Sequence, residues 1–139
     1  ELIHLKAEHI RVGYFDIYTK GGKVRRIYIP KQLSTEATKW LSEQSRSSGY
    51  VFLNQYGQRL TTRGIAQQLK NYARKYGMNE KVVYPHSFRH RFAKNFLDRF
   101  NDISLLADLM GHESIETTRI YLRRSSAEQQ EIVDKVITW

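Results

Sequence analysis

The stretch Pro85-His-Ser-Phe-Arg-His-Arg-Phe-Ala-Lys-Asn-Phe-Leu-Asp-Arg99 decides the fold class of this chain. Pro85 opens the segment, and Phe88, Phe92 and Phe96 then recur at every fourth position. A spacing of four residues repeats on one side of an α-helix. The segment therefore predicts a helix from about residue 86 to residue 99, with its phenylalanines in one row.

Two short helices are predicted after this segment. Asp102 is the expected cap of a helix over Ile103–Met110, which Gly111 closes. Ser114 is the expected cap of another helix, which ends near Leu122. Both helices are expected to be short.

The final segment, Ser125–Trp139, predicts one more helix. Ser125 and Glu128 have the spacing of a capping box. The segment carries three acids and one base, opposite in sign to the rest of the chain. Its apolar side consists of Ile132, Val133, Val136 and Ile137.

A β-hairpin is predicted near the other end of the chain. The segments Tyr14–Thr19 and Val24–Ile29 alternate and are rich in β-branched and aromatic residues. Gly21 and Gly22 lie between them, and glycine accepts the positive φ that tight hairpin turns require. Pro30 is expected to end the second strand.

The remaining segments predict further helices and a short strand. Residues 1–6 are interpreted as the end of a helix, and Ser34 or Thr35 as the cap of a helix through about Gln44. Val51-Phe-Leu53 is a candidate for a short third strand.

Thr61 or Thr62 is the expected cap of the next helix, which Gly77 ends. Its apolar stripe consists of Ile65, Leu69, Tyr72, Ala73 and Tyr76. The 139 residues thus predict one mainly helical domain with a small antiparallel sheet, an α+β fold.

Charge is the most informative feature of the composition. Lys and Arg total 23 against 14 Asp and Glu, a net charge of +9. Residues 20–31 and residues 59–75 each carry five basic side chains and no acid. Single-sign blocks favour a nucleic-acid-binding face, although a well-solvated basic surface is the alternative.

The composition also excludes some classes of protein. The chain has no cysteine, which excludes disulfides and thiolate metal sites. No apolar run approaches the roughly 20 residues of a membrane span, and the first residues lack the layout of a secretion signal. We therefore expect no membrane partner and a cytoplasmic location.

Five residues stand out as candidates for chemistry. Lys20 is at the hairpin turn, and His86 and Arg89 are three apart on one helix, so that both can reach one anion. His112 follows a helix end, and Tyr121 lies on a short amphipathic helix. Taken singly, each has a simpler reading: a solvated turn lysine, a surface pair, a histidine capping a helix, or a packed tyrosine.

Taken together and in order, these segments resemble the C-terminal signature of the tyrosine recombinase family. The family pattern is His-x-x-Arg, then Leu-x-Gly-His, then a Tyr nine residues after that His. Here His112 lies 23 residues after Arg89, and Tyr121 lies nine residues after His112, as in the family. The hairpin Thr19-Lys-Gly-Gly-Lys-Val-Arg25 resembles the family's Gly-Lys-Gly-x-Lys-x-Arg hairpin, which makes Lys20 the candidate catalytic lysine.

The resemblance implies the tyrosine recombinase catalytic fold and DNA strand transfer through a covalent phosphotyrosine. Tyr121 would attack the phosphodiester, and Arg89 and His112 would bind its non-bridging oxygens. His86 would help to remove the tyrosine proton or position the phosphate, and Lys20 would be the general acid for the departing 5′-oxygen.

The partner implied by the resemblance is double-stranded DNA, and the assembly is a homo-oligomer, a tetramer on DNA, joined through the helix at 125–139. The candidate DNA contacts are Lys23 and Arg25 from the first basic block, Arg63 from the second, and Arg91 from residues 89–99, which carry four basic side chains and one acid. No cofactor is expected. No metal is expected either: His86, His90 and His112 could suggest a metal site, but the cationic Arg89 lies beside them and no Asp or Glu occurs between His86 and Arg91.

The resemblance begins inside a family motif. Glu1-Leu2 matches the end of the family's Arg-x-Ser/Gly-Glu-Leu motif, so the first catalytic arginine would fall three residues before Glu1. Residues 1–139 are thus expected to be a fragment of the catalytic domain, without its first helices and without the family's N-terminal DNA-binding domain. The expected setting is the DNA of a bacterium or phage.

Three other functions are compatible with part of the pattern. A type IB topoisomerase uses the same chemistry, but the surroundings of Gly111 and Thr117 look like those of bacterial and phage integrases. A non-catalytic DNA-binding module would explain the basic blocks but needs no nucleophile at Tyr121. A basic protein-binding scaffold would leave the whole ordered set as coincidence.

Overall fold

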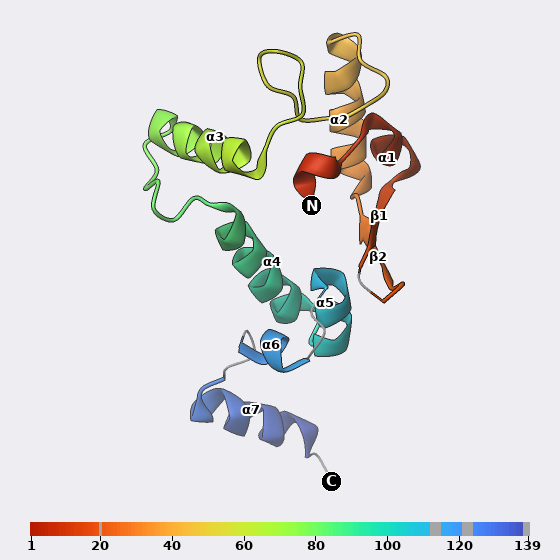
Figure 1. The fold of residues 1–139 in the computed structure, drawn as a ribbon. Helices are drawn as coiled ribbons and strands as arrows, with labels where there is room; N and C mark the ends of the chain where they lie inside the picture. Colours follow the sequence, from red (N-terminus) through yellow and green to blue (C-terminus); the bar gives the residue numbers. More distant parts are fainter. Residues whose placement is uncertain (20, 112–114, 121–123, 138–139) are drawn as a thin grey trace. The chain divides into compact units, whose positions relative to one another are not determined.

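The computed structural model describes residues 1–19, 21–111, 115–120 and 124–137. Within these residues the chain is mainly helical and contains a two-stranded antiparallel sheet (Figure 1). The predicted α+β class is therefore confirmed. The chain divides into two compact units, Glu1–Phe88 and Arg89–Trp139.

The first unit begins with a short turn and ends with a long helix. The sequence predicted the end of a helix over residues 1–6. In the structure only Leu2–His4 form a 3-10 helix, and α1 starts at Ala7. The elements are η1 (Leu2–His4), α1 (Ala7–Val12), β1 (Tyr14–Tyr18), β2 (Val24–Tyr28), α2 (Lys31–Glu43) and α3 (Thr62–Lys75).

The predicted hairpin is confirmed. β1 pairs with β2 in an antiparallel register that sets Asp16 opposite Arg26. Gly21 and Gly22 have φ values of 87° and 75°, in the left-handed region that side chains with a Cβ rarely adopt. The two glycines therefore make this turn possible.

Helix α2 starts earlier than its predicted cap. Pro30 is the N-cap residue, so the helix begins at Lys31 and not after Ser34 or Thr35. The Ser34 hydroxyl instead donates to the Ile10 carbonyl of α1 at 2.6 Å, and the Thr35 hydroxyl donates to the Lys31 carbonyl at 3.0 Å. Hydroxyls inside a helix make such bonds to a carbonyl four residues earlier or on a neighbouring element.

The predicted third strand is wrong. Val51 is buried, and its N–H donates to the Leu5 carbonyl at 2.9 Å. Pairing around it is limited to isolated bridges, Lys6 with Tyr50 and Leu53 with Arg59. The apolar run therefore supplies the core without extending the sheet.

Helix α3 begins as predicted. The Thr61 side chain accepts the Gly64 N–H at 3.0 Å, which satisfies one of the donors that a helix start leaves open. The buried apolar residues of this unit are Ala7, Ile10, Leu41, Val51, Ala73 and Val83.

The second unit is helical and contains its own small core. Ala93 and Leu97 pack against Leu106 and Met110, with Phe96 at the side of the cluster. The helices are α4 (Pro85–Arg99), which begins before the boundary of the units, α5 (Ile103–Met110), α6 (Ile115–Arg119) and α7 (Ser126–Val136).

The phenylalanine row of α4 is only partly a core element. The Phe92 and Phe96 rings lie 6.1 Å apart, and Phe96 lies 5.7 Å from Phe100. Phe88 and Phe92 are about half exposed, however. Alanine and leucine on the neighbouring side of the helix supply the buried contacts instead.

The caps of α5 and α7 are confirmed. The Asp102 carboxylate accepts the Leu105 N–H at 2.9 Å, and Gly111 ends α5 with φ of 73°. Ser125 and Glu128 form the capping box, with bonds of 3.2 and 2.8 Å. The predicted cap Ser114 and the predicted helix end Leu122 lie outside the described residues.

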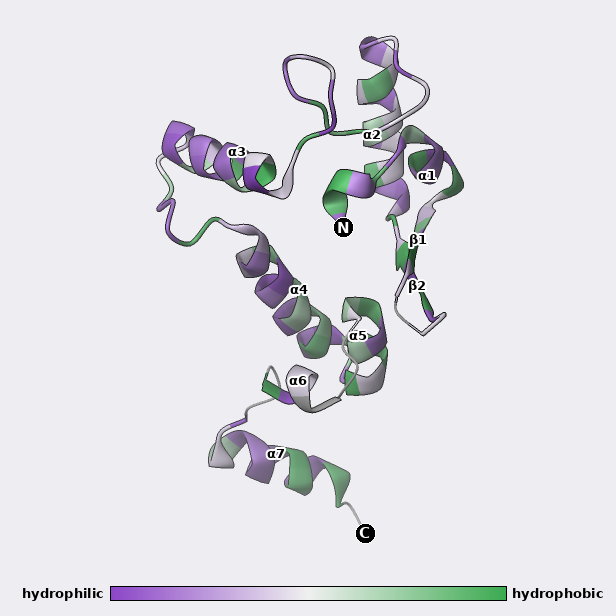
Figure 2. Cartoon of the chain, in the orientation of Figure 1, coloured by the Kyte–Doolittle hydropathy of each residue, from purple (hydrophilic) through white to green (hydrophobic). Residues whose placement is uncertain are grey.

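The apolar side of α7 faces solvent. Its apolar residues, which Figure 2 marks in green toward the C-terminal end of the helix, are 39–66% exposed. They are Ile132, Val133, Val136 and, just after the helix, Ile137. No helix in the described part of the chain is long and apolar enough to cross a membrane.

Candidate functional site

The first turn of α4 carries two of the predicted catalytic residues, His86 and Arg89. Its start is held by Ser87, whose hydroxyl accepts the Tyr84 N–H at 3.1 Å and donates to the Tyr84 carbonyl at 2.6 Å. These two bonds fix the turn from which the imidazole and the guanidinium project. His86 is exposed and Arg89 is half-buried.

Arg89 is anchored on the end of another helix. Its Nη2 donates to the carbonyl of Met110, the last residue of α5, at 2.5 Å. The last carbonyls of a helix lack helical partners and lie at the negative end of its dipole, so they attract a cation. A guanidinium has five N–H donors, so this bond leaves others for an oxyanion.

The bond from Arg89 joins two separate motifs. Arg89 ends the His-x-x-Arg motif, and Met110 is directly followed by Gly111-His112 in the sequence. This hydrogen bond therefore connects two segments 21 residues apart, in addition to the core contacts between α4 and α5.

Three predicted catalytic residues lie outside the described residues: Lys20, His112 and Tyr121. Their roles stay predictions. Their described neighbours are ordered locally. The Thr19 N–H and hydroxyl both donate to the Lys23 carbonyl, at 2.9 and 3.1 Å, and Thr118 is fully buried.

The four predicted DNA contacts differ in exposure. Lys23, Arg63 and Arg91 are exposed. The Arg25 side chain is only 13% exposed and forms an ion pair with Glu1. Arg25 therefore has a partner within the protein that the sequence did not indicate.

The outward face of the hairpin carries a second ion pair. Arg26 donates from Nε and Nη2 to the two carboxylate oxygens of Asp16, at 2.8 and 3.1 Å. Its guanidinium carbon also lies 3.9 Å from the centre of the Tyr14 ring. The hydrogen bond from Arg26 lowers the pKa of Asp16, and the same bond raises the pKa of Arg26.

Sequence reasoning missed both the Asp16–Arg26 pair and the Met110 carbonyl. The first had a partial signal, because the hairpin was predicted and a register centred on Gly21 sets Asp16 opposite Arg26. A register centred between Gly21 and Gly22 would instead set Asp16 opposite Ile27. The role of the Met110 carbonyl had no such signal, because every residue has a backbone carbonyl and the residue type does not show which one is left open.

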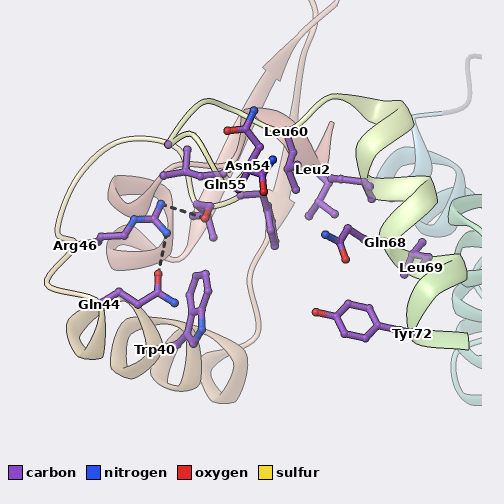
Figure 3. A pocket seen from close by; sticks show the side chains of 15 residues that line it. Leu2, Trp40, Gln44, Arg46, Asn54, Gln55, Leu60, Gln68, Leu69 and Tyr72 are labelled. Atoms are coloured by element: carbon purple, nitrogen blue, oxygen red, sulfur yellow. Dashed lines mark hydrogen bonds between the residues drawn. The ribbon is translucent and has the colours of Figure 1, made fainter. Parts of the chain in front are cut away.

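One pocket has neither a carboxylate nor a histidine in its lining. It lies in the first unit and has a volume of about 640 Å³. Trp40, Leu69 and Tyr72 line it, and Arg46 is the one charged side chain of its lining (Figure 3). Arg46 donates to the Val51 carbonyl at 3.1 Å, so it serves to hold the wall of the pocket. An apolar recess without a carboxylate or histidine fits an apolar side chain better than a reaction.

No group of three or more His, Cys, Asp or Glu side chains suited to a metal ion occurs among the residues that the structure describes. That no metal takes part stays a prediction.

Comparison with known proteins gives one family throughout. The sequence model of the phage integrase family matches residues 1–128. The tyrosine recombinase XerC of Leptospira interrogans is 39% identical over 140 residues, which cover 97% of this chain and 45% of the relative. The tyrosine recombinase XerA of Pyrococcus furiosus is 36% identical over 141 residues, 97% of this chain and 48% of the relative.

Solved structures agree on the fold. The crystal structure of XerA recombinase matches all of this chain and 51% of its own, with a TM-score of 0.75 and 24% identity. The Tn1549 transposon integrase in complex with transposon right end DNA matches 99% of this chain and 54% of its own, with a TM-score of 0.74 and 15% identity. XerH bound to its difH substrate in a post-cleavage complex matches 86% of this chain and 35% of its own, with a TM-score of 0.66 and 25% identity. The predicted tyrosine recombinase fold is confirmed.

Proposed function

Because this chain belongs to the phage integrase family, we propose that it is the catalytic part of a site-specific DNA recombinase that cuts and rejoins strands through Tyr121. The chain spans about half the length of the curated relatives that it matches. The activity, substrate and assembly of the whole protein are therefore part of this proposal.

One observation carries this proposal. The hydrogen bond from Arg89 to the Met110 carbonyl joins the His-x-x-Arg motif to the segment that continues into Gly111-His112. A recombinase needs these two motifs at one phosphate, because both stabilise the charge that develops on its oxygens. A DNA-binding module without catalysis has no need for this convergence.

The proposed substrate is double-stranded DNA. The net charge of +9 attracts a polyanion, and the exposed Lys23, Arg63 and Arg91 offer phosphate contacts. XerH and the Tn1549 integrase are solved with DNA, which supports the same partner here. We place the protein with the DNA of a bacterial or phage genome, in the cytoplasm.

The proposed reaction breaks one P–O bond and forms another. The Tyr121 hydroxyl attacks phosphorus in line, and the bond to the 5′-oxygen breaks, which leaves a 3′-phosphotyrosine. The tyrosine proton leaves toward His86, because a free phenol has a pKa near 10. The ammonium of Lys20 gives its proton to the departing oxygen, and a 5′-hydroxyl of a second strand later reverses the steps.

A homo-oligomer is the proposed working form, a tetramer on paired DNA sites. The exposed apolar side of α7 is the feature that supports it, because a short helix gains stability mainly by docking its apolar side. The apolar pocket around Trp40, Leu69 and Tyr72 on a second copy is a recess of matching chemistry (Figure 3).

Covalent capture tests the proposed function. The parent protein is mixed with a nicked suicide DNA substrate, and the protein–DNA adduct is measured on a denaturing gel. We expect an adduct for the wild type and none for Tyr121→Phe, which keeps the ring and removes the nucleophile.

The matched control is Tyr56→Phe. Tyr56 is 78% exposed and lies outside the predicted site, so its adduct should equal that of the wild type. An adduct that persists in Tyr121→Phe would overturn the assignment of the nucleophile.

A further inference from the structure

The outward face of the β1–β2 hairpin is held by an interlocked set of three side chains. Asp16 and Arg26 are direct partners in the register, and two parallel hydrogen bonds of 2.8 and 3.1 Å join them. The Tyr14 ring lies 3.9 Å from the guanidinium carbon of Arg26. The Arg26 side chain is therefore restrained by a partner on the opposite strand and by a ring diagonal to it.

The same hairpin is closed at its tip by Thr19. Its N–H and its hydroxyl both donate to the Lys23 carbonyl, at 2.9 and 3.1 Å. Gly21 and Gly22 carry the positive φ values of the turn between these two residues. The strands are thus tied by side chains both in the middle and at the end.

This arrangement is more than an ordinary surface ion pair. A two-stranded hairpin is marginal by itself, so its alignment depends on the side chains that cross between the strands. The Arg74–Glu80 pair provides a contrast, because it joins residues only six apart in sequence. Asp16 and Arg26 instead join the two strands that lead to and from the loop containing position 20.

We propose that Asp16, Arg26 and Tyr14 form a cross-strand clamp that positions the hairpin tip for proton donation to the departing 5′-oxygen. These three are positioning residues, since they act through Lys20 and touch no substrate. The inference rests on the proposed function, in which the Lys20 ammonium loses its proton to the 5′-oxygen as the P–O bond breaks.

A sulfur leaving group tests the clamp. In a DNA whose scissile 5′-oxygen is replaced by sulfur, the P–S bond breaks without a proton donor, because a thiol has a pKa near 8.5 and leaves as its anion. The full-length protein and its variants are compared on the oxygen and sulfur substrates. Variants that impair only proton donation are slow on oxygen and normal on sulfur.

We expect Asp16→Asn to slow cleavage of the oxygen substrate by roughly tenfold, a part of the 10²–10⁴ that general acid catalysis contributes. On the sulfur substrate its rate should lie within about threefold of the wild type, since no proton is needed there. Asp16→Glu keeps the carboxylate and should restore most of the rate on oxygen. Glu80→Gln makes the same change of charge at the Arg74 pair and should leave both rates unchanged.

Lys20→Ala separates the clamp from the function on which it rests. If Lys20→Ala is slow on both substrates, the general-acid role of Lys20 fails. In the other case, the sulfur substrate restores the cleavage rate of Lys20→Ala, and the role of Lys20 stands. The clamp is then overturned if Asp16→Asn cleaves both substrates slowly, or both at the wild-type rate.

Discussion

At the scale of single residues, Arg89 has the most informative environment. Its guanidinium is half-buried and one arm is held by the Met110 carbonyl. A planar fork held at one end presents its other donors in a fixed direction, which a flexible ammonium cannot do. We therefore expect Arg89 to act through the direction of its donors and not only through its positive charge.

Arg89→Lys is predicted to separate catalysis from binding. The change keeps the charge and loses the fork, so cleavage by the parent protein should fall roughly 10²–10³-fold, the usual cost of one transition-state donor. Affinity for DNA should change little, because binding is spread over many cations. Single-turnover cleavage and a gel-shift titration measure the two quantities.

The control is Arg91→Lys, the same substitution at an exposed position two residues later on α4. It should leave the cleavage rate within about twofold, since lysine keeps the charge that an exposed cation contributes. An equal loss of binding and cleavage in Arg89→Lys would make Arg89 a general DNA contact.

At the scale of elements, α5 holds the second unit together and carries the anchor of Arg89. It contributes Leu106 and Met110 to the core, and it runs from the Asp102 cap to Gly111. With only eight residues it is too short to be stable by itself, so its caps and its buried side contribute most of its stability. Loss of the cap at its N-terminus should therefore lower the stability of the core that α5 helps to form.

Asp102→Ala is predicted to destabilise the protein by about 1 kcal/mol, the typical cost of losing an N-cap. Thermal or urea unfolding of the parent protein measures this loss. Asp98→Ala makes the same substitution at an exposed position on α4 that caps no helix, and its stability should stay within about 0.5 kcal/mol of the wild type. Equal losses in both variants would contradict the capping role.

At the scale of the whole molecule, charge is unevenly distributed along the chain. Two acid-free basic blocks precede residue 76, whereas the last fifteen residues are acidic. Lys23 and Arg63 from the basic blocks are exposed, and so is the apolar side of α7. We therefore propose that the basic blocks bind DNA and that α7 serves assembly, so that the two roles belong to different parts of the chain.

The affinity for duplex DNA is predicted to fall steeply with salt, with a log–log slope of roughly −0.9 for each phosphate neutralised. Arg63→Gln should reduce the slope by about one contact. Lys39→Gln removes one charge outside the basic blocks and should leave the slope unchanged. Fluorescence anisotropy from 50 to about 300 mM salt covers the useful range. A flat dependence would count against the basic blocks as the binding face.

Val136→Asp is predicted to weaken cooperative assembly on paired sites while single-site binding persists. Val136 is 66% exposed, so a carboxylate there should weaken the docking of α7 on a second copy more than it lowers the stability of the fold. Lys135→Gln changes the net charge by the same amount one residue earlier and should leave cooperativity intact. Gel shifts on one-site and two-site DNA measure the effect. A large fall in melting temperature for Val136→Asp would show that α7 serves its own domain.

The sequence by itself determined the features that depend on neighbours in the chain. The hairpin follows from alternation and paired glycines, and the starts of α3, α5 and α7 follow from Thr61, Asp102 and Ser125. These signals are local, because a cap or a turn involves residues only a few positions apart. At the start of α2 two such signals differed: Ser34 was one of the predicted caps, but Pro30 is the N-cap residue in the structure.

Only the tertiary structure decided which charged groups serve the fold. Arg25, predicted to contact DNA, is paired with Glu1, and Arg89 is held by the Met110 carbonyl. These contacts join residues 24 and 21 positions apart. No sequence period reports such contacts, because they depend on which elements pack together and on where backbone carbonyls are left open. The residue types at the site follow from the sequence, whereas the orientation of Arg89 depends on the folded chain.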